Sequence, residues 1–295
     1  QVSVEVKSAA SPGHGTLSLA LAQLSANAAA FGTATNLVYN DGEWLQADPG
    51  FMNLSPIDGP PECQYGEGIV RDPDLLRQLL EARVWRSADT RRGSSFGPFR
   101  EALVDVLSDL WRDDQGLVHG ISPGVTAPAD LIVRTWLRAV QFTKDGHIGE
   151  SITPLDVCDA MANIANARPE ETVLDPFAGF GGLLASVELI RPGQVGQLKG
   201  YDINQTAHEV ANKLLSLLNR NENLACLDSR TQQWPKSDVI ISAPPFGLRL
   251  EEATELPFGR VKEVDVAAIA WAAQALKPGG RAVLLTSRGW TFRSG

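Results

Sequence analysis

The stretch "TVLDPFAGFGGLLASVELI", residues 172–190, decides the fold of this chain. A short β-prone run ends at Asp175, a turn containing Gly179, Gly181 and Gly182 follows, and an apolar run typical of a helix comes next. Glycines allow a tight turn and let a ligand approach the backbone where a helix begins. The turn lacks both the third glycine of the dinucleotide fingerprint and the Lys-Ser/Thr of a phosphate loop. An acid at its head repels phosphate, so the pattern indicates a cationic or zwitterionic ligand.

The same alternation continues toward the C-terminus. Strand-like runs occupy residues 198–202, 223–227, 238–242 and 281–287, and helical runs occupy residues 205–219 and 264–276. This alternation predicts an α/β fold with a doubly wound, mostly parallel, Rossmann-like sheet that carries helices on both faces. Ligands of such sheets bind beyond the carboxyl ends of the strands. The residues directly after each strand are therefore the candidates for a functional site.

Acidic residues follow the second and third strands as well as the first. Asp202 in "GYDIN" stands 23 residues after Gly179, where a carboxylate can accept both hydroxyls of a ribose. The alternative is that it caps the helix expected to begin near Gln205. Asp228 in "CLDSR" could accept from an adenine amino group, and its alternative is an Asx turn. Three acids after successive strands, together with the glycine turn, favour a ligand site.

The run "DVIISAPPFGLRL", residues 238–250, is a strand that stops at two prolines and a phenylalanine. Proline fixes φ, so the turn is rigid and can hold a backbone carbonyl in place. This indicates a site where a planar group is held against the ring of Phe246. The alternative is an ordinary strand-ending turn with Phe246 in the core.

The preceding part of the chain divides in two. Residues 1–68 are rich in Gly, Pro, Ser and Asn, include one expected helix within residues 16–31, and receive no role. Residues 69–146 form a small helical domain, with amphipathic helices expected in residues 72–85, 97–114 and 127–142. The arginines of this domain are interpreted as solvated side chains rather than as DNA ligands.

Composition narrows the possible function classes. The 295 residues carry 26 Lys and Arg against 35 Asp and Glu, a net charge of −9, which argues against a chain that grips nucleic acid by itself. The three Cys and four His are scattered, so neither a disulfide framework nor a metal site is expected. The sequence shows no membrane-spanning run and no signal peptide, and a cytoplasmic protein is the expectation.

Residues 147–295 resemble the S-adenosylmethionine-dependent N6-adenine DNA methyltransferases, specifically the modification subunits of type I restriction systems. The matching motifs occur in the family's order: "GESITP" (149–154), "VLDPFAGFGGLL" (173–184), "GYDIN" (200–204), "LDS" (227–229), "SAPPFG" (242–247) and "LKPGGRAVLLTSRGWTFRSG" (276–295). The resemblance covers about half of the chain.

The resemblance implies a class I methyltransferase fold and S-adenosylmethionine as cofactor. It assigns cofactor binding to Thr153, Pro154, Asp175, Phe177, Gly179, Gly181, Asp202, Ile203 and Asp228. It assigns catalysis to Ala243, Pro244, Pro245 and Phe246. The base is flipped out and stacked on Phe246, and its amino protons are accepted by the Pro244 carbonyl and by residue 243. The implied partners are DNA and a specificity subunit or a further C-terminal region, in a restriction-modification or related defence system.

Two departures from the family's pattern qualify these expectations. Ser151 stands where an aromatic residue is common, and Ala243 stands where the family has Asn, Asp or sometimes Ser. Alanine removes a side-chain acceptor, which favours the alternative of a catalytically weakened component that binds cofactor or DNA. A further alternative is a methyltransferase that acts on another planar amide or amine, such as a protein glutamine, since related enzymes use the same turn. Family members carry two further strands after residues 281–286, so residues 147–295 are expected to be incomplete at the C-terminus.

Overall fold

The computed structural model describes residues 2–7, 35–40, 43–47, 54–57, 68–89, 97–140, 152–222, 224–256 and 259–287. The chain divides into two compact units, residues 1–65 and 66–295. The first contains a four-stranded sheet in the order β1-β2-β3-β4, whose strands are Val2–Lys7, Thr35–Asn40, Glu43–Ala47 and Leu54–Ile57. The helix expected within residues 16–31 lies outside the described residues.

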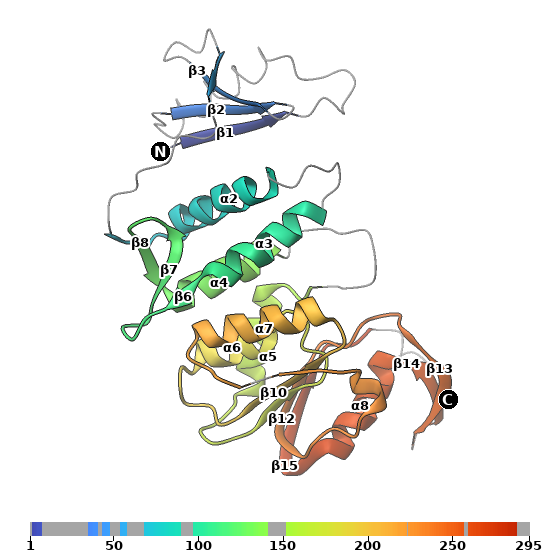
Figure 1. Ribbon diagram of the computed structural model, residues 1–295. Helices are drawn as coiled ribbons and strands as arrows, with labels where there is room; N and C mark the ends of the chain where they lie inside the picture. The colour runs from blue at the N-terminus through green and yellow to red at the C-terminus, as the bar shows by residue number, and fades with distance from the viewer. Residues whose placement is uncertain are drawn as a thin grey trace. The chain divides into compact units, whose positions relative to one another are not determined.

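The second unit contains the predicted parallel sheet (Figure 1). Its strands are β9 (Val173–Asp175), β10 (Leu198–Asp202), β11 (Ala225–Cys226), β12 (Ser237–Ser242) and β15 (Leu276–Leu284). They lie in the order β11-β10-β9-β12-β15, and every neighbouring pair is parallel. The order reverses between β9 and β12, which places the expected ligand crevice beyond their carboxyl ends. The predicted class I, Rossmann-like fold is confirmed.

Helices cover both faces of this sheet because its strands are apolar on both faces. Val173, Val239 and Ile241 pack into one buried cluster with α5 (Leu155–Ala165), α6 (Gly182–Ile190) and α7 (Gln205–Leu217). Their neighbours Leu174 and Ile240 pack into a second cluster with α8 (Val264–Ala275). Successive side chains on a strand point to opposite faces, so each of these strands contributes to both clusters.

Residues 68–140 contain the three expected helices, α2 (Pro73–Asp89), α3 (Gly97–Asp109) and α4 (Ala129–Val140). They are not a purely helical domain, however. Four strands form a sheet in the order β5-β8-β7-β6, namely Gly68–Ile69, Trp111–Arg112, Leu117–Ser122 and Val125–Pro128 for β5 to β8. The second helix therefore ends at Asp109 and not at residue 114. The physical reason is that Trp111–Arg112 pairs with β7, which the Pro123-Gly124 turn joins to β8 as a hairpin.

The α4 helix packs against the helices of the parallel sheet. Its Trp136 is buried and meets Phe180 edge-on, with ring centroids 6.0 Å apart. Its Arg134 donates to the Asp159 carboxylate of α5 at 2.7 Å. The segment before the sheet is thus joined to the glycine turn through Phe180.

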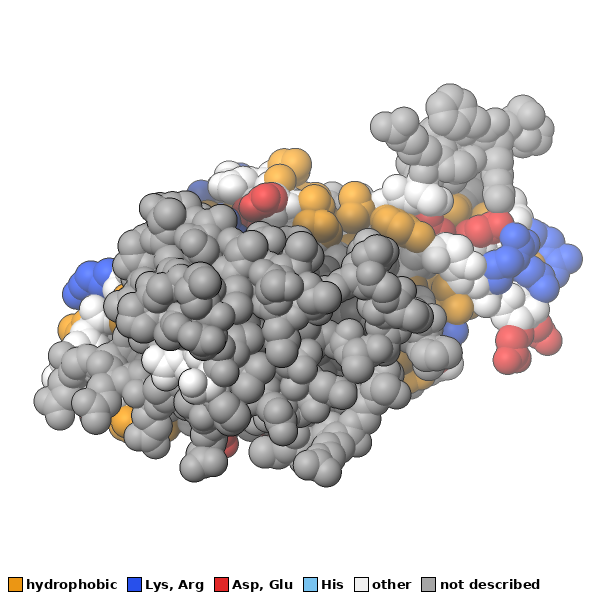
Figure 2. Space-filling view, turned by 90° about the horizontal axis from the view of Figure 1, so that it is seen from above, with side chains coloured by type: hydrophobic (Ala, Val, Ile, Leu, Met, Phe, Trp, Pro, Cys, Tyr) orange, Lys and Arg blue, Asp and Glu red, His pale blue; other side chains and the backbone are white. Residues whose placement is uncertain are grey.

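Two further features complete the second unit. The strands β13 (Arg249–Leu256) and β14 (Gly259–Glu263) form an antiparallel hairpin between β12 and α8, which the sequence pattern did not reveal. None of the helices in the described ranges is long and apolar enough to cross a membrane. On the face shown in Figure 2, the coloured basic side chains lie in separate groups, some of them beside acidic side chains, and they form no continuous basic surface.

Candidate functional site

The glycine turn follows β9 and depends on two left-handed backbone positions. Gly181 has a φ of +79°, and a Cβ added there would stand 2.9 Å from the Cβ of Ala211, so glycine lets the turn pack closely on α7. Gly179 has a φ of +52°, and an added Cβ would meet no atom within 4 Å. The backbone at Gly179 therefore borders open space, as a surface that a ligand approaches should.

Asp202 ties the end of β10 to this turn. Its carboxylate accepts from the backbone N–H of Gly179 at 2.8 Å and from that of Asn204 at 2.8 Å. The side chain that caps α7 belongs to Asn204, which accepts from the N–H of Ala207 at 3.0 Å. The helix-cap alternative for Asp202 is therefore wrong. The adjacent Ile203 is 65% exposed and offers an apolar surface next to the acid.

Asp175, at the end of β9, is fully buried. Its Oδ1 accepts from the Ser242 hydroxyl at 2.7 Å and from the Phe177 N–H at 3.1 Å. Its Oδ2 is buried and has no hydrogen-bond partner among the described residues. Burial raises the pKa of Asp175 to about 7, and the charge of Asp202 acts in the same direction, while the two hydrogen bonds lower it.

Asp228 follows β11 and is engaged by its own neighbour. It accepts from the N–H of Arg230 at 3.0 Å, and its Oδ2 accepts from the guanidinium at 2.6 Å. The Arg230 hydrogen bonds hold the pKa of Asp228 below its usual range. The Asx turn proposed as its alternative is thus present, and its carboxylate is already paired with a cation.

The proline turn follows β12 at the same edge of the sheet. Pro244 is buried, whereas the ring of Phe246 is 47% exposed, so the core alternative for Phe246 is wrong. The methyl group of Ala243 packs against the cluster beneath α5 and α6. The Ser242 hydroxyl is buried on Asp175 and does not replace the acceptor that is missing at residue 243.

The segment before α5 meets the other side of the glycine turn. Pro154 precedes the helix, and the Thr153 carbonyl accepts a weak hydrogen bond from the Cys158 thiol at 3.6 Å. The sulfur would lie 3.2 Å from a Cβ on Gly182, directly after the turn. Burial raises the pKa of Cys158 to about 12, so the thiol stays neutral. Residues 149–151, including Ser151, lie outside the described residues.

Aromatic residues that the motifs did not single out support the turn from the opposite face. Phe177 meets Trp234 edge-on at 6.0 Å, and Trp234 meets Trp271 at 5.7 Å. Trp234 is held by its indole N–H, which donates to the Ser229 carbonyl at 2.9 Å. The sequence offered no signal for these contacts or for the hydrogen bond from Ser242 to Asp175, because each depends on which strands and helices become neighbours. Arg230 pairs with Asp228 two residues away, and the motifs did not single it out.

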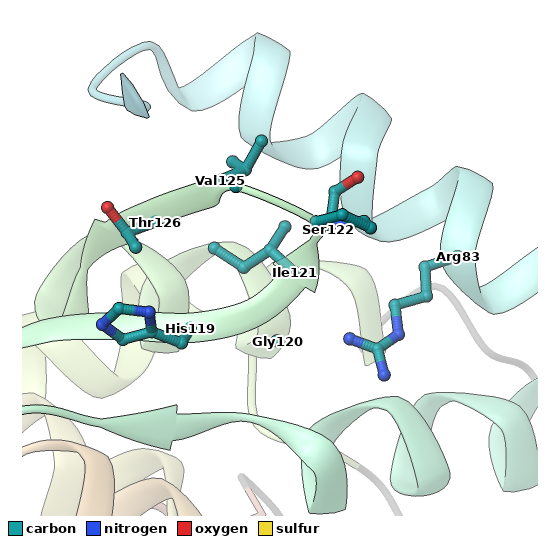
Figure 3. Close-up of a pocket in the computed structure, with 9 residues that line it drawn as sticks. Arg83, His119, Gly120, Ile121, Ser122, Val125 and Thr126 are labelled. Atoms are coloured by element: carbon teal, nitrogen blue, oxygen red, sulfur yellow. The ribbon is translucent and has the colours of Figure 1, made fainter. Parts of the chain in front are cut away.

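A separate cavity of about 620 Å³ lies between the β7–β8 hairpin and α2 (Figure 3). It is lined by Arg83 of α2 and by residues 119–126. Beside it, His119 stacks on Trp111 with ring centroids 4.1 Å apart. No residue of the parallel sheet lines this cavity. In the described ranges, no group of three His, Cys, Asp or Glu side chains could hold a metal ion.

The residues at the sheet edge fit a sulfonium cofactor. Asp202 supplies negative charge, Asp175 adds a second negative charge when it is ionised, and the buried Oδ2 of Asp175 lacks a donor or cation in the described part of the chain. Open space at Gly179 and the exposed Ile203 allow an extended ligand to lie across the ends of β9 and β10. A phosphate ligand would be repelled by the same acids.

A solved structure shares this architecture. A protein from Listeria monocytogenes described as a class I S-adenosylmethionine-dependent methyltransferase has 15% identity and a TM-score of 0.56, with 75% of each chain covered, and it has the same fold. A type I restriction-modification methyltransferase subunit from Streptococcus thermophilus has 21% identity and a TM-score of 0.47, covering 56% of this chain and 41% of its own. A type I modification subunit from Vibrio vulnificus has 21% identity and a TM-score of 0.48, covering 57% and 41%. The chain thus spans less than half the length of these two subunits.

A protein-family model also matches this chain. The N-6 DNA methylase model matches residues 135–295, more than half of the chain, beginning inside α4 and including every strand of the parallel sheet. The match also includes the glycine turn, the acids after the strands and the proline turn whose geometry is described above. This chain belongs to the N-6 DNA methylase family.

Proposed function

We propose that residues 147–295 form the catalytic domain of an S-adenosylmethionine-dependent DNA adenine N6-methyltransferase of the type I modification-subunit kind. The observation that carries the proposal is the exposed ring of Phe246 after β12, beside the acid-lined glycine turn after β9. Base methylation requires a stacking ring next to a binding site for a cationic cofactor.

Cofactor binding is proposed at the carboxyl ends of β9 and β10, and this binding site is called the cofactor seat. S-adenosylmethionine supplies the methyl group to be transferred. The Asp202 carboxylate, held by the N–H groups of Gly179 and Asn204, accepts the ribose hydroxyls. Ile203 provides an apolar surface for the adenine ring, and Thr153 and Pro154 close the side next to α5. The carboxylate of Asp228 approaches the adenine amino group only if its pairing with Arg230 loosens.

Substrate binding is proposed at the proline turn. Phe246 stacks on an adenine extruded from the duplex, and the rigid turn holds the Pro244 carbonyl to accept one amino proton. The second amino proton has no side-chain acceptor at Ala243. A water molecule there would support slow transfer, because loss of one positioned catalytic hydrogen bond costs on the order of 10²–10³ in rate.

One observation favours a second candidate, a weakened component that retains binding. The methyl group of Ala243 packs against the apolar cluster beneath α5 and α6, so the position is integrated into the core in its present form. In this candidate the domain binds cofactor or DNA within an assembly and transfers methyl groups slowly or not at all.

DNA binding is proposed to depend on a specificity subunit or a further C-terminal region. Three arginines before the sheet are paired with acids: Arg77 with Glu81 at 2.8 Å, Arg83 with Asp109 at 2.6 Å and Arg134 with Asp159 at 2.7 Å. Cations that are already paired neutralise fewer phosphates.

Asp202→Ala tests the cofactor assignment. Loss of charge-assisted hydrogen bonds to the ribose should weaken S-adenosylmethionine binding by ~1–3 kcal/mol, measured by calorimetry. Asp238→Ala is the matched control, since Asp238 lies at the opposite end of the sheet and pairs with Lys277. Undiminished affinity in Asp202→Ala would refute the assignment.

Methyl transfer itself is measured with a tritiated methyl group on adenine-containing single and double strands, with Phe246→Ala as the variant that lacks the stacking ring. Label on N6 of adenine, lost in Phe246→Ala, supports the first candidate. Cofactor binding without transfer supports the second, and transfer to a protein glutamine would overturn both.

A further inference from the structure

One hydrogen bond joins the cofactor turn to the catalytic turn. The Ser242 hydroxyl donates to Asp175 Oδ1 at 2.7 Å across 67 residues of sequence, and both side chains are 0% exposed. Asp175 begins the glycine turn, and Ser242 immediately precedes Ala243. The two parts of the proposed site are therefore connected through a buried carboxyl group.

On balance, the surroundings of Asp175 disfavour a negative charge. Its Oδ2 is buried without a partner in the described ranges. On β10, Asp202 adds a like charge, and on α5, Cys158 is a neutral thiol and Asp159 is paired with Arg134. Ser242 and the Phe177 N–H are the groups that favour the ionised form, and burial outweighs them. A buried carboxyl group in such surroundings retains its proton near neutral pH.

We propose that Asp175 carries a proton when the cofactor seat is empty and releases it to solvent when the cationic cofactor binds, and that the Ser242 hydroxyl sets the pH at which this happens. The O–H bond of the carboxyl group breaks, the proton goes to the buffer, and the carboxylate remains opposite the ligand's positive charge. The identity of the ligand rests on the proposed function, and the proton release is additional to it.

The physical reason is the low dielectric of the buried site. A positive charge nearby stabilises a carboxylate far more strongly there than in water, without direct contact. Binding therefore lowers the proton affinity of Asp175, and by linkage binding tightens as the pH rises through the titration of the empty site. Ser242 is a positioning residue, because it acts on the cofactor seat through Asp175.

The test is calorimetry of S-adenosylmethionine with the full chain in buffers of different ionisation enthalpy. With an Asp175 pKa of about 7, about half a proton should be released per ligand at pH 7, and more at pH 6. S-adenosylhomocysteine is the matched ligand, because it keeps the nucleoside and amino acid but lacks the sulfonium charge. It should release clearly less.

Variants distinguish the contribution of Asp175 from that of Ser242. Asp175→Asn should abolish the proton release. Ser242→Ala should move the midpoint of the pH dependence of binding upward by ~1 unit, since a hydrogen bond to the ionised form is lost. Ser242→Thr keeps the hydroxyl and should restore the midpoint. Ser237→Ala removes another buried hydroxyl of the same strand, which donates to the Pro235 carbonyl, and should leave the midpoint unchanged.

Each outcome of these measurements either supports or overturns the proposal. Proton release with the sulfonium ligand that depends on Asp175 and shifts with Ser242 supports the proposal. Binding with no release, or equal release with S-adenosylhomocysteine, overturns it and leaves the proposed function intact. Failure of the parent chain to bind S-adenosylmethionine over pH 6–9 overturns the proposed function together with this inference.

Discussion

Three aspartates follow three strands of this protein, and each has a different electrostatic environment. Asp175 is buried beside another acid and has a raised pKa, whereas Asp228 is paired with Arg230 and has a lowered pKa. Asp202 accepts from two backbone N–H groups and remains partly exposed at the seat. One residue type at one kind of position thus supplies a buried carboxyl group with a raised pKa, an ion pair and a partly exposed hydrogen-bond acceptor.

The raised pKa of Asp175 predicts a pH-dependent contribution to stability. The folded value of about 7 exceeds the unfolded value of 3.8, so the folded state binds more protons between them. The contribution is present below about pH 4 and is lost as the pH rises toward and through about 7. Asp175→Asn removes this dependence. As the pH rises from 5 to 8, the free energy of unfolding of the parent should therefore fall by a few kcal/mol relative to that of Asp175→Asn, on the order expected for this pKa shift. Urea titrations at both pH values measure this, and an unchanged difference between the two proteins would contradict it.

Ala243→Asn tests the chemistry of the proline turn. A restored side-chain acceptor should raise methyl transfer to adenine by ~10-fold or more, since a recovered hydrogen bond of ~1.4 kcal/mol corresponds to that factor. Cofactor affinity should stay nearly unchanged, because residue 243 faces the substrate amine in the proposed site and not the proposed cofactor site. The tritiated-methyl assay compares parent and variant side by side.

The packing of Ala243 supplies the control for this experiment. Ala243→Val adds bulk against the same apolar cluster without adding an acceptor, so it should not raise transfer. A parent that is already fast, and that is abolished by Asn, would show that the account of this turn is wrong.

At the scale of elements, the edge strand β15 holds the end of α5. Arg281 donates to the carbonyls of Ala165 and Asn166 and makes two hydrogen bonds to the Glu171 carboxylate, at 2.9 and 2.7 Å. Asn166 terminates the helix in the left-handed conformation, with a φ of 46°. These last carbonyls lack partners within the helix, and a cation from a distant strand satisfies them.

Arg281→Met should therefore lower the free energy of unfolding by ~2–3 kcal/mol, since several charge-assisted hydrogen bonds are lost from a side chain that is 29% exposed. Lys277→Met is the matched comparison on the same strand. Lys277 pairs with Asp238 but is 41% exposed, so its loss should cost no more than ~1 kcal/mol. Chemical denaturation measures both, and equal effects would refute the helix-end role of Arg281.

At the scale of the whole molecule, charge predicts how the chain meets DNA. With a net charge of −9 and three of the arginines before the sheet paired with acids, affinity for random duplex should be no tighter than a Kd of ~10⁻⁴–10⁻⁶ M at physiological salt. Fluorescence anisotropy on a labelled duplex measures this. A specificity partner should tighten binding and steepen its salt dependence, and nanomolar binding by the 295-residue chain alone would contradict the prediction.

Local pattern was sufficient for the architecture of the methyltransferase half. The strands at 198–202 and 238–242 were predicted to within one residue, and the acids and the proline turn were placed at one sheet edge. This succeeds because side-chain periodicity and glycine positions act over a few residues, and parallel strands end at a common edge. The same reasoning overlooked the β6–β8 strands, whose short runs adjoin strong helical patterns.

The amino-acid sequence by itself determined the alternation of strands and helices, the glycine and proline turns, and the family. Tertiary structure alone decided that Ser242 meets Asp175, that Arg281 holds the end of α5 and that Asp202 accepts from the Gly179 N–H. The physical reason is that hydrogen-bond partners and burial depend on which strands become neighbours. Burial of the chain around Asp175, rather than any residue adjacent to it in sequence, gives that carboxyl group its raised pKa.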